Sequence, residues 1–101
     1  MAALHLVFRS PGESSALEQC LARAGADDAV LLLEDGVYGA VESAHGVFGR
    51  TGAPGPAVFV LVADLEARGL ASSCLAPTVR PIDYPGFVAL TVAHNPFVSW
   101  I

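Results

Sequence analysis

Lysine is absent from this chain of 101 residues, and its five arginines are outnumbered by ten acidic side chains. The formal net charge is therefore −5. An acidic surface repels the phosphates of nucleic acids and of anionic lipid headgroups. We therefore expect no direct nucleic-acid partner and no membrane partner.

Long apolar runs are also missing. No run approaches the roughly 18–20 residues that a membrane-spanning helix needs. The first nine residues lack a basic segment followed by a long apolar one, so we expect no signal peptide and a cytoplasmic location. The sequence contains only two cysteines, Cys20 and Cys74. In that compartment they are predicted to remain free thiols.

Motifs for metals and cofactors are lacking as well, so we expect neither. The histidines at positions 5, 45 and 94 have no metal-ligand spacing with each other or with the cysteines. We expect His5 to be a hydrogen-bonded core residue, His94 to end a helix, and His45 to be the histidine that faces a crevice. The glycine-rich segment 46–56 lacks the Gly-Lys-Ser/Thr signature of a phosphate-binding loop and is predicted to be an ordinary loop.

What the sequence does have is apolar material. Hydrophobic residues make up 53% of it, and the mean hydropathy is +0.55. A chain of this size buries only about two thirds of its unfolded surface. Either the core is tightly packed between strands that are apolar on both faces, or other subunits cover part of the apolar surface.

The apolar runs alternate with helical patterns, which predicts an α/β fold. Strands are expected at residues 3–8, 29–33, 57–63 and 79–82, and helices at 15–24, 35–44, 65–70 and 87–93. Pro81 restricts its strand to an edge or a strand end. The segment 95–101 is too apolar for a solvated tail. We predict a single domain, 1–101, with a three-layer, doubly wound, mostly parallel sheet of four to five strands, as in flavodoxin-like proteins.

Two acids stand where the second strand ends. Glu34 and Asp35 precede Gly36 after the apolar run 29–33. A magnesium site of the receiver type would need a further acid after the first strand and a lysine, and the chain has neither at those places. We therefore interpret the two acids as part of a helix N-terminus, where negative charge is favourable.

Cys20 is the first candidate for chemistry. Its helix places it with Leu17, Leu21 and Ala24 on one apolar stripe, which favours a packing role. A reactive thiol would need a neighbouring positive charge, and Arg23 follows one turn later. Cys74 lies in a loop-like segment with no histidine or aspartate beside it.

Four segments together resemble one known family. They read LHLVFRSP at residues 4–11, LLLEDGVY at 31–38, DLEARGL at 64–70 and IDYPGFVALT at 82–91. In order and spacing they are similar to the DsrH/TusB family of intracellular sulfur-relay subunits, within the DsrE-like superfamily. The resemblance covers essentially the full chain.

The resemblance implies a function that composition does not. Family members assemble with two homologous subunits, DsrE/TusD-like and DsrF/TusC-like, into a heterohexamer. The complex passes persulfide sulfur to a DsrC/TusE-like carrier. In one branch this serves dissimilatory sulfur oxidation, and in the other the 2-thiouridine of tRNA.

The segment LEQCL at residues 17–21 resembles the sulfur-oxidation version, which carries a cysteine on the first helix. This makes the sulfur-oxidation branch our main expectation, with Cys20 as the candidate persulfide carrier. Two alternatives remain open. One is a TusB-like subunit of the tRNA relay, and the other is a structural or docking subunit with no chemistry of its own.

Overall fold

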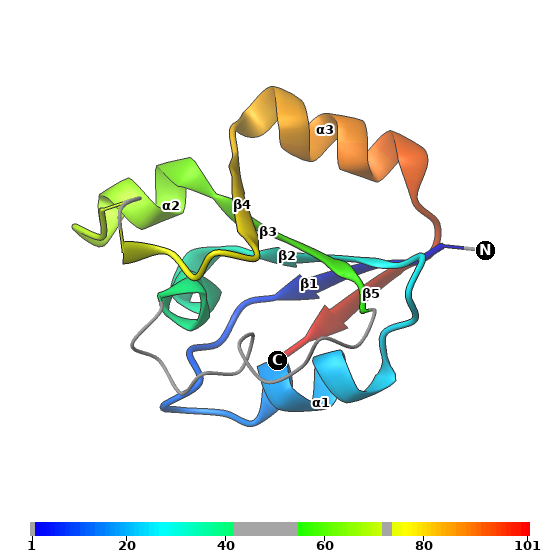
Figure 1. Ribbon diagram of the computed structural model, residues 1–101, viewed down its shortest axis with the longest axis horizontal. Coiled ribbons are helices and arrows are strands. Elements are labelled where there is room, and N and C mark those ends of the chain that lie inside the picture. The colour runs from blue at the N-terminus through cyan, green and yellow to red at the C-terminus, as the bar shows by residue number, and fades with distance from the viewer. Residues whose placement is uncertain (1, 42–54, 72–73) are drawn as a thin grey trace.

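The computed structural model describes residues 2–41, 55–71 and 74–101, which form a five-stranded sheet flanked by helices (Figure 1). The strands are β1 (Leu4–Val7), β2 (Ala29–Leu32), β3 (Ala57–Leu61), β4 (Val79–Ile82) and β5 (Phe97–Trp100). Their order is β4-β3-β2-β1-β5, and every neighbouring pair is parallel. The predicted α/β fold with a parallel sheet is confirmed.

Helices cover both faces of this sheet. They are α1 (Ala16–Arg23), the 3-10 helix η1 (Glu34–Ala40), α2 (Val62–Ala67) and α3 (Tyr84–Ala93). α1 lies on one face and α3 on the other, as Figure 1 shows with the sheet seen nearly edge-on. Two-sided coverage explains why β2 is buried at every position and reads as an unbroken apolar run.

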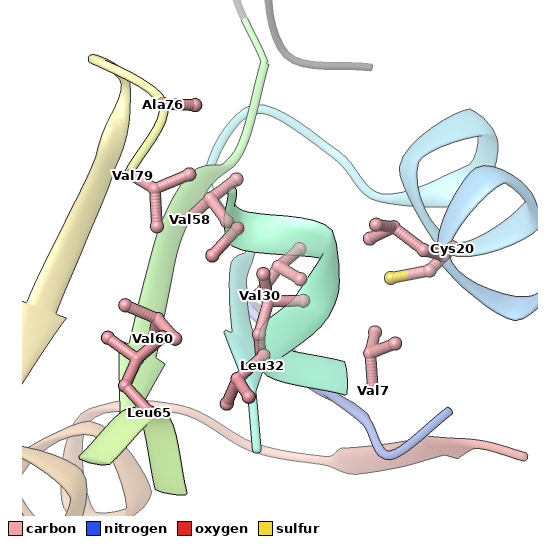
Figure 2. Close-up of a cluster of buried hydrophobic side chains, with 12 residues drawn as sticks. Val7, Cys20, Val30, Leu32, Val58, Val60, Leu65, Ala76 and Val79 are labelled. Carbon is pink, nitrogen blue, oxygen red and sulfur yellow. The ribbon is translucent and has the colours of Figure 1, made fainter. Parts of the chain in front are cut away.

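Each face of the sheet has its own hydrophobic cluster. The larger one lies on the α1 face (Figure 2). Its fully buried members include Val7, Leu17, Cys20, Val30 and Leu32. The smaller one lies on the α3 face, with the buried residues Leu4, Ala29, Leu31 and Leu61. α3 contributes only the partly buried Phe87 and Leu90 to it. The α3 face is therefore the less completely covered of the two.

The final strand refines the expectation for the C-terminal segment. Residues 95–101 were expected not to form a solvated tail, and Phe97–Trp100 form strand β5, which lies beside β1 at one edge of the sheet. β4 forms the opposite edge. Because β4 contains Pro81 and is an edge strand, the predicted edge placement of that proline is confirmed.

The segment after β2 differs from the expectation. A helix was expected over 35–44, and the structure has a 3-10 helix over Glu34–Ala40. Gly36 lies against the carbonyl group of Val7, and Gly39 lies against Leu17 and Pro11. Because these two glycines have no side chain, the backbone can approach β1 and α1 closely, and it does so as a tight 3-10 helix instead of a regular α-helix. The third strand also ends earlier than expected, because α2 already begins at Val62.

Candidate functional site

The side chain of Cys20 is fully buried between α1 and the sheet. Figure 2 shows its sulfur directed from α1 toward the strands. Burial, reinforced by the negative charge of Asp28, raises the pKa of the Cys20 thiol to about 12. The thiol is therefore protonated near neutral pH. A nucleophilic thiolate at this position requires the contact between α1 and the sheet to open.

Cys74 has the opposite environment. It is a free, exposed thiol on the segment that leads into β4. Cys20 is free as well. In the described structure, Cys20, the candidate persulfide carrier, is therefore hidden from solvent, and Cys74 is open to it.

Asp28 is the most heavily hydrogen-bonded side chain of this region. Its carboxylate accepts from the backbone N–H groups of Ala3 and Gly25, each at 2.9 Å, and from His5 Nε2 at 2.9 Å. These bonds hold the pKa of the Asp28 carboxyl well below its usual range, the Ala3 bond most and the His5 bond next. Asp28 thus joins the loop before β2 to the start of β1.

His5 bridges Asp28 to the last strand. It is only 6% exposed, and its Nδ1 accepts from the indole N–H of Trp100 at 3.0 Å. The prediction of a hydrogen-bonded core histidine is confirmed. The prediction for His94 is confirmed too, because His94 ends α3 and its Nδ1 donates to the Leu90 carbonyl oxygen at 2.9 Å. His45 and most of the glycine-rich segment lie outside the described residues.

Two polar contacts hold the junction after β2, and a third lies within the α2 segment. The Asp64 carboxylate on α2 accepts from the backbone N–H of Glu34 at 2.6 Å. Arg68 donates from Nε to Asp35 at 2.9 Å and from Nη1 to the Asp64 carbonyl oxygen at 3.4 Å. Asp35 lies in the first turn of η1, as the helix-terminus interpretation expects. The contacts of Asp64 with Glu34 and of Arg68 with Asp35 were not anticipated from the sequence.

An apolar surface runs along α3. This ten-residue helix has no buried residue and no charged side chain. Tyr84, Val88 and Val92 are 57%, 58% and 84% exposed. On β5, Phe97 is 55% exposed. A helix that is apolar all round belongs in an interior, yet only one side of this helix meets the sheet. We call Tyr84, Val88 and Val92 the α3 surface.

The described part of the chain shows no metal centre. Across residues 2–41, 55–71 and 74–101, no group of three or more His, Cys, Asp or Glu side chains could hold a metal ion. Within the same ranges, no helix is both long enough and apolar enough to cross a membrane. What the site offers chemically is two thiols, one hidden and one exposed.

Two residues of this region, Asp28 and Trp100, were missed as partners from the sequence. Asp28 falls between the helix expected at 15–24 and the strand expected at 29–33, and no role as a hydrogen-bond partner was assigned to it. Trp100 was expected to pack, without a polar partner. The available signal was that Trp100 is the only tryptophan and His5 the only polar residue in an apolar strand. A buried histidine and a buried indole N–H both require hydrogen-bond partners.

Comparisons with known proteins extend over nearly the whole chain. The profile of the family described as DsrH like protein matches residues 9–97. Protein TusB from Shigella sonnei is 38% identical in an alignment 99 residues long that covers 96% of this chain and 99% of that protein. Protein TusB from Shigella flexneri is 39% identical over the same shares.

A solved structure agrees with the fold. The solution structure of Protein Tm0979 from Thermotoga maritima superposes with a TM-score of 0.69 at 25% identity, covering 90% of this chain and 92% of that one. Taken with the matched profile and the TusB relatives, this shows that the chain belongs to the DsrH/TusB family of sulfur-relay subunits.

Proposed function

We propose that the chain is a TusB-like structural and docking subunit of a sulfur-relay complex, and that the α3 surface is where it meets a partner subunit. The observation that carries the proposal is the character of α3. All ten of its residues lack a formal charge, none of them is buried, and Val92 is 84% exposed.

Apolar surface of this kind costs free energy in water, at about 25 cal/mol per Å². A contiguous exposed patch usually marks a protein–protein contact. The partners implied by the family resemblance are the homologous DsrE/TusD-like and DsrF/TusC-like subunits. An uncharged helix face suits such a permanent interface, because subunit interfaces exclude charge from their centres.

The branch that we favour is the tRNA 2-thiouridine relay. The relatives at 38% and 39% identity carry the name TusB. This supports the TusB-like alternative over the sulfur-oxidation branch that the Cys20 segment favoured.

The environment of Cys20 supports a docking role in place of a chemical one. Persulfide exchange needs a thiolate that attacks a sulfane sulfur. The Cys20 thiol is fully buried and its pKa is raised to about 12. Sulfur transfer through Cys20 stays a prediction, and it requires α1 to move away from the sheet when the complex acts.

Sulfur transfer by the reconstituted complex tests this proposal. The chain is co-expressed with its two partner subunits, loaded by a persulfide donor, and assayed for sulfur on the downstream carrier. We expect the Cys20→Ala variant to co-elute with its partners and to support transfer at the wild-type rate. Loss of transfer in an intact Cys20→Ala complex, together with a one-sulfur adduct on Cys20 in the wild type, would overturn the docking role. Elution of the wild-type chain as a separate monomer would overturn assembly itself.

A further inference from the structure

Three side chains from separate parts of the chain are joined by hydrogen bonds, with His5 of β1 in the middle. Trp100 Nε1–H donates to His5 Nδ1 over 3.0 Å, and His5 Nε2 lies 2.9 Å from Asp28 Oδ2. An indole N–H can only donate, so Nδ1 is the accepting nitrogen and carries no proton. The single proton of the neutral imidazole is therefore on Nε2, where it points at the carboxylate. Together the two partners select one tautomer of the neutral ring.

The charged groups around the imidazole act in opposite directions. The Asp28 carboxylate, held ionised by its backbone donors, favours a positive charge on the ring. Arg23 of α1 has its guanidinium carbon 6.0 Å from the centre of the Trp100 ring, and its charge disfavours a second cation nearby. α1 also buries the Cys20 thiol on this face of the sheet. Because its pKa is raised to about 12, this thiol keeps its proton near neutral pH and adds no charge. β5 contributes the uncharged indole.

We propose that His5 is a pH-sensitive latch for the C-terminal strand β5. A proton taken up from solvent has to bind Nδ1, because Nε2 already carries one. The Nδ1–H and the indole N–H would then be two donors facing each other without an acceptor. The indole must give up its bond and turn away. The bond from His5 to Asp28 is kept and becomes charge-assisted on both sides.

Losing the hydrogen bond between Trp100 and His5 weakens the attachment of β5 to the sheet, because of where β5 lies. β5 is an edge strand that is paired to β1. At its end, the backbone bond from Phe8 N–H to the Trp100 carbonyl oxygen is long, at 3.5 Å. The Trp100 ring also packs against the cluster on the α1 face. Protonation of His5 at Nδ1 therefore loosens the last strand. This inference is independent of the proposed function.

The single tryptophan makes the latch directly observable. In the wild-type protein, the pH is lowered while nuclear magnetic resonance follows the Trp100 indole N–H and the His5 ring protons. We expect the indole resonance to shift and exchange faster with the same midpoint as His5, and the tryptophan emission to move to longer wavelength. The His94→Gln variant keeps this transition, and His5→Gln abolishes it. An indole resonance that stays constant while the His5 ring titrates would overturn the latch.

A second variant tests the same bond without altering His5. Trp100→Phe removes the donor that stabilises the unprotonated Nδ1. By linkage, the midpoint of the His5 ring titration then moves to higher pH, by roughly half a unit or more. A midpoint that is unchanged or lowered in the folded Trp100→Phe variant would show that the indole bond does not control the charge of His5.

Discussion

The backbone of Gly36 lies so close to the carbonyl oxygen of Val7 that no side chain fits between them. The contact joins the first turn of η1 to the end of β1, and it falls within the segment 31–38 that carried part of the family resemblance. The Glu34–Gly36 junction is thus a packing joint between two parallel strands, braced by α2 through Asp64 and Arg68.

Replacing this glycine tests the joint. In Gly36→Ala the added Cβ would collide with the Val7 carbonyl group, which is backbone and cannot turn aside. We expect a loss of about 3 kcal/mol or more in the free energy of unfolding, measured by urea denaturation. Gly12→Ala is the control, because its nearest heavy atom would be 3.9 Å away. Similar stability of the two variants would contradict the close approach.

The two cysteines are expected to differ sharply toward a thiol reagent. Cys74 is exposed, whereas Cys20 is buried with its pKa raised to about 12. In the Cys74→Ser variant, we expect Cys20 to react more than about 100-fold more slowly than Cys74 does in Cys20→Ala near pH 8. The rate for Cys20 should keep rising with pH up to about 12, and unfolding should remove the difference. Equal rates in the folded variants would show that the buried position is wrong.

Acid stability should depend on Asp28. Its pKa is lowered in the folded protein, so its stabilisation is complete above the unfolded value of about 4 and is lost as the pH falls below it. Asp28→Asn should cost about 2 kcal/mol at neutral pH and flatten the decline in stability below pH ~4. Thermal unfolding across the pH range measures both effects.

Asp27→Asn is the matched control for that experiment, because the neighbouring Asp27 is exposed. Asp27→Asn should have the stability of the wild type at neutral pH, and its stability should fall in acid as that of the wild type does. If Asp28→Asn retained the wild-type decline, the three bonds to its carboxylate would not be stabilising the folded state.

Much of the fold was predictable because parallel strands buried on both faces read as apolar runs. β2 at Ala29–Leu32 is the clearest case. β5 was not foreseen as a strand, since the Phe97-Val98-Ser99-Trp100 segment is short and only half buried at a sheet edge. η1 was expected as a longer helix, because the contacts that tighten it, such as Gly36 against Val7, exist only after the strands pair.

The site was partly predictable for a similar reason. The apolar stripe of α1 correctly indicated that Cys20 faces the core. Its coupling to Asp28 could not be foreseen, because Asp28 lies on a loop whose position depends on the pairing of β1 with β2. The high apolar content indicated that other subunits could cover part of the surface, but composition could not place that surface on α3.

The central claim is that the α3 surface holds a partner subunit, and Val92→Arg tests it most directly. Val92 is 84% exposed on α3, so the substitution should leave the fold intact while placing a charge in the interface. Ala22→Arg adds the same charge at an exposed position on α1, on the opposite face of the sheet. The affinity of each folded variant for the co-purified partner subunits is then measured by calorimetry or sedimentation. We predict that Val92→Arg weakens assembly at least about 30-fold, equivalent to ~2 kcal/mol, while Ala22→Arg binds as the wild type does. Wild-type affinity in Val92→Arg would contradict the account.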